Sequence, residues 1–204
     1  MKRKFYTGLA AALLTFAALL APTTPATATH AVTDAALTPE PEPQASSIGV
    51  NGFFSVDPAQ QGSTFQAAVV MEIPRGLHVN SNKPLGKYAV PTVVKVDAPR
   101  GFRVTPVTYP RGTVRTFNFG GSEESRIAVY EGRTIFRFNV SVPAGQPFGV
   151  ENVRVSVRFQ SCTDEVCYPP ATRNLDLHIA VVGRDVTSNR INGSYFGGGG
   201  RRKR

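Results

Sequence analysis

Two cysteines separated by four residues are the side chains of this sequence whose type and spacing best suit covalent chemistry. Cys162 and Cys167 enclose a polar spacer, residues 163–166, and the chain has no other cysteine. Such a spacer suits a β-hairpin that a disulfide closes. A closed loop of six residues contributes only about 2 kcal/mol in the chain-entropy account, so a purely stabilising bridge would gain more by linking distant strands. A short exposed loop is also a place where a partner's thiolate can reach a sulfur.

The residues alone leave two uses of this pair open, a structural hairpin disulfide and a redox centre. Zinc would need two further ligands, and the three histidines, His30, His78 and His178, are far apart in the sequence. We expect His178 to lie on the solvent-exposed face of its strand and His78 to lie in a loop or to face solvent. No metal site and no cofactor are therefore predicted. The sequence has no nucleophile elbow and no glycine-rich phosphate loop after a strand.

The segments that must position the cysteines alternate between apolar and polar residues. This period of two is typical of strands with one buried and one solvent-exposed face. The β-rich segments are residues 65–73, 93–97, 102–109, 127–130, 134–142, 153–159 and 175–181. No segment between residues 48 and 183 has convincing helical periodicity. The pattern predicts an all-β fold, an immunoglobulin-like antiparallel β-sandwich.

Composition and charge limit the number of domains and the kinds of partner that the chain can have. With 204 residues, 41% hydrophobic and 18% charged, the chain can build one globular domain. The formal net charge is +9, but residues 48–183 hold 14 Lys/Arg against 10 Asp/Glu, so much of the excess lies at the two ends. No aromatic-basic motif accompanies the charge, and we expect no nucleic-acid partner.

The ends of the chain have the composition of targeting and linker segments. Residues 1–28 are typical of a signal peptide, with Lys2-Arg3-Lys4 before an apolar run and Ala26-Thr27-Ala28 at the cleavage site. An uncleaved N-terminal anchor is the alternative. Residues 29–47 form a Pro-rich linker, residues 48–183 the sandwich, and residues 184–204 a flexible basic tail. We expect a periplasmic or secreted protein without a transmembrane segment, whose tail is either solvated or touches an anionic envelope surface.

Several short motifs resemble one known family. The sequence Phe159-Gln160-Ser161-Cys162, the acidic spacer and Cys167-Tyr168-Pro169-Pro170 are similar to the cysteine hairpin of the N-terminal periplasmic domain of the thiol:disulfide interchange protein DsbD. Residues 76–84, 91–93 and 119–122 also resemble segments of that domain. The resemblance covers about residues 48–183, and its Cys-Tyr-Pro-Pro block is the most specific part.

The resemblance implies an immunoglobulin-like sandwich whose two cysteines cycle between dithiol and disulfide. It implies exchange with a thioredoxin-fold redox protein, with Cys167 forming the mixed disulfide and Cys162 resolving it. An aromatic cap loop shields the pair in that family, which maps onto Phe119 at the tip and Phe117 beside it. Tyr168, Pro169 and Pro170 would support the hairpin, because proline limits how the chain can turn away.

The sequence departs from the family pattern in three ways. It contains neither the membrane domain nor the thioredoxin-like domain of the full transporter, so we expect a separate protein, such as a membrane electron transporter, to supply them. The cysteine spacer is shorter than usual, and the expected acidic residues of the cap loop are absent. Asp164 and Glu165 lie within the spacer instead, where a carboxylate would raise the pKa of a neighbouring thiol. The alternative function is a non-catalytic binding or scaffold module with a structural disulfide.

Overall fold

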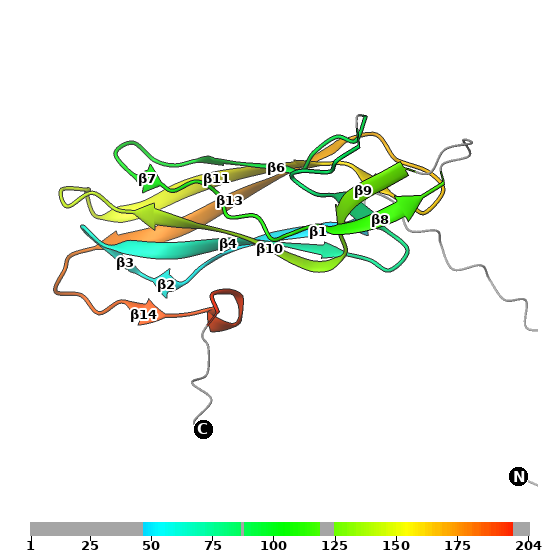
Figure 1. The fold of residues 1–204 in the computed structure, drawn as a ribbon. Helices are drawn as coiled ribbons and strands as arrows, with labels where there is room; N and C mark the ends of the chain where they lie inside the picture. The colour runs from blue at the N-terminus through cyan, green and yellow to red at the C-terminus, as the bar shows by residue number, and fades with distance from the viewer. Residues whose placement is uncertain (1–46, 87, 119–124, 198–204) are drawn as a thin grey trace, which may run out of the picture. The chain divides into compact units, whose positions relative to one another are not determined.

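The computed structural model describes residues 47–86, 88–118 and 125–197. Among these residues the regular elements are strands and one short 3-10 helix (Figure 1). They are β1 (Gly49–Phe54), β2 (Val56–Asp57), β3 (Ala59–Gln60), β4 (Thr64–Ile73), β5 (His78–Asn80), β6 (Val93–Asp97), β7 (Arg103–Val104), β8 (Thr113–Phe117), β9 (Ser125–Tyr130), β10 (Gly132–Ser141), β11 (Gly149–Phe159), β12 (Ser161–Cys162), β13 (Ala171–Val182), β14 (Asn189–Arg190) and η2 (Gly193–Tyr195).

Two four-stranded sheets form what we call the sandwich body. One has the strand order β1-β4-β10-β7 and the other β3-β13-β11-β6. Every pairing within them is antiparallel except that of β13 with β3. Figure 1 shows them as two layers, with β6, β11 and β13 in one and β1, β4 and β10 in the other. The prediction of an all-β, immunoglobulin-like sandwich is confirmed.

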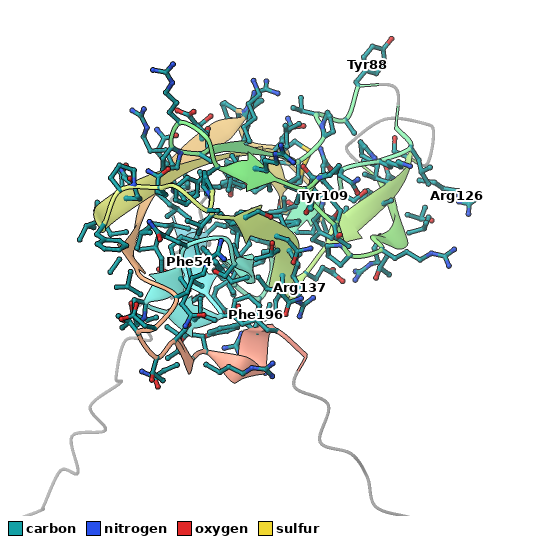
Figure 2. All side chains as sticks on the ribbon, turned by 90° about the vertical axis from the view of Figure 1, so that its left-hand side faces the viewer. Phe54, Tyr88, Tyr109, Arg126, Arg137 and Phe196 are labelled. Carbon is teal, nitrogen blue, oxygen red and sulfur yellow. A yellow bond between two sulfur atoms is a disulfide. The ribbon has the colours of Figure 1, made fainter. Side chains whose placement is uncertain are left out.

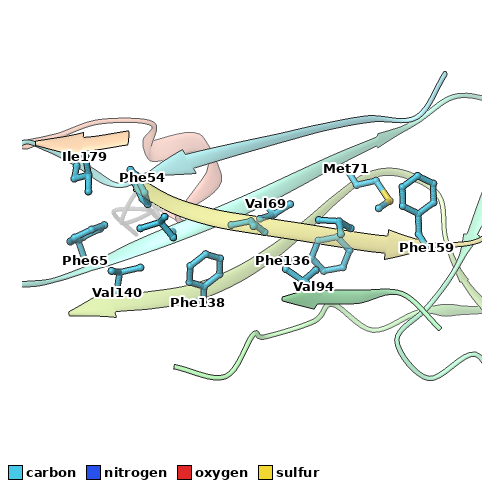
Figure 3. Close-up of a cluster of buried hydrophobic side chains, with 14 of the residues drawn as sticks. Phe54, Phe65, Val69, Met71, Val94, Phe136, Phe138, Val140, Phe159 and Ile179 are labelled. Carbon is cyan, nitrogen blue, oxygen red and sulfur yellow. The ribbon is translucent and has the colours of Figure 1, made fainter. Parts of the chain in front are cut away.

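The alternating residues of the long strands fill the space between these layers. In β10, the buried side chains include Phe136, Phe138 and Val140, and in β11 the same spacing buries Val153, Val155, Val157 and Phe159. Figure 3 shows several of them packed against residues of β4 such as Met71. Each large apolar side chain removed from water contributes about 1.5–3 kcal/mol, so this core supplies most of the stability of the domain.

A third sheet, with the order β12-β5-β9-β8, carries the cysteines. We call this sheet, together with residues 161–168, the cysteine end. Its longest strand, β9, has six residues, whereas four strands of the sandwich body have ten or more. Beneath it lies a separate small cluster of buried apolar side chains, Phe117, Ile127 and Val129, with Ala89 packed against them. The cysteine end therefore has little apolar core of its own.

The segment 102–109, predicted as one strand, is only partly regular. The strand β7 has two residues, and a single bridge between Thr108 and Arg137 follows it. Pro106 lies between them and lacks the backbone N–H that a continuous ladder needs. Tyr109 still points inward, and its hydroxyl accepts a hydrogen bond of 2.8 Å from the backbone N–H of Val94.

The packed chain continues to residue 197, although we expected a flexible tail from residue 184. Strand β14 pairs with β2, and the rings of Tyr195 and Phe53 stack with 4.2 Å between their centroids. The side chain of Arg137 donates to the carbonyl of Tyr195 over 2.7 Å, and the Asn192 amide donates to the carbonyl of Phe54 over 3.0 Å. These contacts join residues more than fifty positions apart, so local composition did not reveal them.

No helix within the described part of the chain is both long enough and apolar enough to cross a membrane. The segments expected as signal peptide and linker lie outside the described residues, apart from Ser47.

Candidate active site

Cys162 and Cys167 form a disulfide at the tip of a tight hairpin, with 4.0 Å between their Cα atoms. They lie opposite each other as an antiparallel bridge. On one side the N–H of Tyr168 donates to the carbonyl of Ser161 over 2.9 Å, and on the other the N–H of Thr163 donates to the carbonyl of Val166 over 2.8 Å. The cysteines are thus a non-hydrogen-bonded pair, the arrangement in which opposite side chains approach most closely.

The turn of this hairpin is held by one threonine side chain. The Thr163 hydroxyl accepts hydrogen bonds from the backbone N–H groups of Glu165 at 3.2 Å and Val166 at 3.0 Å. Hydroxyl residues favour such turns because they replace backbone acceptors locally. Asp164 and Glu165 are exposed at the turn. The hairpin predicted from the polar spacer is present.

The two cysteine residues differ in their exposure to solvent. Cys162 lies in β12, pairs with β5 and is fully buried, with an exposed fraction of 0%. Cys167 lies on the returning arm of the hairpin and is exposed. A reagent that approaches from solvent therefore meets Cys167 and not Cys162.

A polar network joins the hairpin to the segment after β5. The Gln160 side-chain oxygen accepts from the Asn80 amide at 3.0 Å and from the backbone N–H of Val90 at 3.2 Å, and the Gln160 amide donates to the carbonyl of Tyr168 at 3.2 Å. The hydroxyl of Thr92 donates to the carbonyl of Asn80 at 2.6 Å. Sequence reasoning assigned no role to Gln160 or Asn80, although both lie inside the motifs that carried the family resemblance.

The residues expected to support the hairpin occupy its returning arm. Tyr168 is half-buried and packs against the main core, while Pro169 and Pro170 are exposed. The chain then enters β13 at Ala171. Tyr168 thus connects the exposed cysteine arm to the sandwich body.

The expected cap residues are only partly within the described structure. Phe119 lies outside the described residues, together with the glycines that follow it. Phe117, at the end of β8, is buried and stacks on the imidazole of His78, with 4.1 Å between ring centroids and 22° between ring planes. Phe117 is therefore part of the small apolar cluster beneath the cysteine sheet.

The prediction that His78 faces a loop or solvent is wrong. Its exposed fraction is 2%, and its neighbours Leu77, Val79 and Asn80 are buried as well. The alternation rule fails here because both faces of β5 are covered: Val79 lies in the main core, and His78 packs against the ring of Phe117. His178 is exposed on β13, as predicted.

Burial lowers the pKa of His78 to about 4, because a charged imidazolium loses its hydration there. The Asp164 carboxylate opposes this shift and the Arg115 guanidinium adds to it. His78 is therefore neutral at neutral pH.

A pocket of about 500 Å³ lies beside the exposed cysteine. Tyr88, Val166 and Ile127 give it an apolar character, Arg126 and Glu165 contribute opposite charges, and Cys167 forms part of its wall. Tyr88 is 86% exposed, and Figure 2 shows its side chain and that of Arg126 pointing outward. Within the described ranges, no group of three or more His, Cys, Asp and Glu side chains is placed to hold a metal ion.

Comparison with known proteins places these features in context. A family model described as thiol:disulfide interchange protein DsbD, N-terminal, matches residues 48–179, which include both cysteines. A search of curated proteins finds no match.

Three similar solved structures have low sequence identity to this chain. The reduced N-terminal domain of DsbD from Neisseria meningitidis is 17% identical, with a TM-score of 0.40 over 69% of this chain and 88% of that one. The N-terminal periplasmic domain of ScsB from Proteus mirabilis is 14% identical, with a TM-score of 0.41 over 65% and 48%. The complex between the DsbD and PilB N-terminal domains from Neisseria meningitidis gives 19% identity, with a TM-score of 0.37 over 61% and 80%.

Proposed function

Because the chain belongs to the family of DsbD N-terminal domains, we propose that its Cys162–Cys167 disulfide is a reversible redox centre that exchanges with a thioredoxin-fold partner. The domain would pass two electrons at a time to or from that partner in the cell envelope. Cys167 would form the mixed disulfide, and Cys162 would resolve it.

The observation that carries this proposal is the unequal burial of the two cysteine residues. Exchange begins when a thiolate attacks a disulfide sulfur, so the sulfur that solvent can reach selects the attacked residue. Cys167 is exposed and Cys162 is fully buried. Attack on Cys167 breaks the bond to Cys162, which leaves as a thiolate and takes up a proton. The domain is then bound to its partner through Cys167, and one thiol remains inside.

The pocket beside Cys167 suits the docking of a partner's chain. Tyr88 and Val166 present exposed apolar surface on its wall, and Glu165 and Arg126 offer one charge of each sign. An apolar pocket with few polar groups is the usual form of a binding site. The hydrogen bonds of Gln160 to Asn80 and Val90 keep this wall in place relative to the hairpin.

The test uses two reduced single variants and a thioredoxin-like protein that lacks its own resolving cysteine and whose remaining cysteine carries a nitrobenzoate thiol as a mixed disulfide, so that attack by the variant's thiolate expels the nitrobenzoate thiolate and joins the two proteins. Cys162→Ser should accumulate a covalent complex that dithiothreitol dissolves, because nothing resolves it. Cys167→Ser should accumulate little, because its remaining thiol is buried. Equal trapping by both variants would contradict the roles assigned to the two sulfurs. No trapping by either, with a disulfide that survives millimolar dithiothreitol in the folded protein, would leave the structural, non-catalytic module.

The proposed location rests on the N-terminal sequence. We propose that a signal peptidase cleaves after Ala28 and releases the domain into the periplasm or beyond, where disulfides persist. A membrane electron transporter would supply reductant, and the basic residues 201–204 would contact anionic surfaces. Intact-mass measurement of the exported protein tests the cleavage, and retention of residues 1–28 would contradict it.

A further inference from the structure

A buried histidine lies directly across the sheet from the buried cysteine. In the antiparallel pairing of β12 with β5, Cys162 is opposite His78. Side chains of directly opposite residues lie on the same face of a sheet, with Cβ atoms about 4.5–5.5 Å apart. Both residues are almost fully buried, and the imidazole is fixed by its stacking on Phe117. His78 is thus a titratable group with little access to solvent beside the sulfur that must resolve the mixed disulfide.

The Nε2 atom of His78 is buried and has no hydrogen-bond partner. Such atoms are rare in folded proteins, and each one calls for an explanation. The structure contains the oxidised pair, in which Cys162 is bonded to Cys167 and carries no proton. Reduction gives Cys162 an S–H group, the one donor at this position whose presence depends on the redox state.

We propose that His78 is the proton acceptor of Cys162. In the dithiol form, Nε2 accepts a hydrogen bond from the Cys162 thiol, and it takes that proton when Cys162 attacks the mixed disulfide. This inference rests on the proposed exchange function, and it assigns to His78 a role that the motif carrying the family resemblance does not.

The resolving step is balanced in atoms and electrons. The Cys162 proton moves to Nε2 while the Cys162 sulfur attacks the sulfur of Cys167. The bond between Cys167 and the partner breaks, and its electron pair leaves on the partner's sulfur. The imidazolium then returns its proton to that thiolate directly or through water. The domain is oxidised to the disulfide and the partner is reduced.

The electrostatics around His78 keep it neutral at rest, and the same burial makes it a weak base, so its protonated form is only transient. The side chain must be neutral at rest, and its burial ensures this at neutral pH. Asp164, on the hairpin turn, favours the imidazolium that forms during the step, while Arg115 on β8 disfavours it. Arg115 is itself paired with Glu131 at 2.8 Å, which partly offsets its charge. A buried thiol resists ionisation, so a base that removes its proton in place lowers the barrier to attack.

The kinetic test uses the reduced mature protein and a symmetric nitrobenzoate disulfide, which releases one coloured thiolate per attack. The first release reports attack by Cys167, and the second reports resolution by Cys162. We expect His78→Gln and His78→Phe to slow the second release by about 100-fold, the lower end of general-base contributions, and to leave the first unchanged. The matched control, His178→Gln, alters an exposed histidine on β13 and should change neither phase.

Nitrogen NMR of the unaltered protein tests the same point without a variant. Reduction should move the Nε2 resonance of His78 in the direction that hydrogen-bond acceptance produces, and that of His178 should stay in place. The role of His78 as proton acceptor would be overturned by a second release at the wild-type rate in both His78 variants. It would also be overturned by an Nε2 resonance that does not move on reduction. Absence of the second release in the wild-type protein would instead overturn the proposed exchange function.

Discussion

The sandwich body and the cysteine end are both made of antiparallel strands, but they differ in what they bury. The core of the sandwich body is apolar, with Phe136, Val153 and Val157 wholly removed from solvent. Among the described residues, four buried side-chain polar atoms have no hydrogen-bond partner, and three of them belong to His78, Asn80 and Ser161 at the cysteine end. The buried polar atoms without a partner thus lie mostly around the Cys162–Cys167 disulfide.

The longest strands of the two regions differ as well. Strands β4, β10, β11 and β13 of the sandwich body have 10, 10, 11 and 12 residues, whereas β12, β5, β8 and β9 have two, three, five and six. Short strands share few backbone hydrogen bonds and a small core, so they open at lower free energy than the rest of a fold. The comparison predicts that the sandwich body is rigid and that the cysteine end can adjust locally.

The largest expected effect comes from the core of the sandwich body. Phe136→Ala should lower the free energy of unfolding by about 3–5 kcal/mol, since the side chain is fully buried and leaves a cavity. Denaturant unfolding of the oxidised protein measures it. Phe148→Ala, at an exposed position, is the control and should stay within about 0.5 kcal/mol of wild type. A small loss in Phe136→Ala would mean that the body does not dominate stability.

Acid should weaken the fold through the cysteine end. The pKa of His78 is about 4 in the folded protein against 6.5 as its ordinary value, so the unfolded chain binds the proton first as pH falls. Stability from this group is complete above about pH 6.5 and is lost between there and pH 4, by about 3 kcal/mol. Denaturant unfolding across this range should show a smaller loss in His78→Gln and an unchanged loss in His178→Gln. Parallel curves for His78→Gln and wild type would contradict the assignment.

Reduction of the disulfide should lower the free energy of unfolding by less than Phe136→Ala or acidification does. The bridge closes a loop of six residues, worth about 2 kcal/mol in the chain-entropy account. We expect reduction to lower the free energy of unfolding by at most this amount. Amide hydrogen exchange should become faster only in β5, β12 and their loops. Hydrogen exchange of the oxidised and reduced protein measures both. Faster exchange throughout β10 and β11 would show that the two regions unfold together.

The smallest expected effect on stability is that of Phe119→Ala. The family resemblance assigns this ring to the cap over the cysteines, so its removal should speed alkylation of the reduced thiols while the unfolding free energy changes little. Phe148→Ala again serves as the control. Unchanged alkylation with a large loss of stability would make Phe119 an ordinary core residue.

The sequence by itself determined the sandwich and the hairpin. Alternation located β4, β10, β11 and β13, and in the last three one face packs on the shared core while the other is less buried. The spacer between Cys162 and Cys167 indicated the disulfide-closed hairpin, since a polar turn of that length brings two strand residues opposite each other. The Cys-Tyr-Pro-Pro block then pointed to the family that the comparison found.

Only the tertiary structure decided what surrounds the sulfurs. Periodicity placed His78 at the surface, but both faces of β5 are covered, with Val79 in the main core and the His78 ring against Phe117. The contacts of Gln160 with Asn80 and Val90 join residues 70 to 80 positions apart, which no local pattern encodes. Which cysteine is exposed also depends on the packing around β12, which leaves Cys162 with no exposed surface. The local sequence determines where strands and turns form, because these depend on neighbouring residues. The burial of a side chain and its exposure to solvent depend instead on which distant segments pack together.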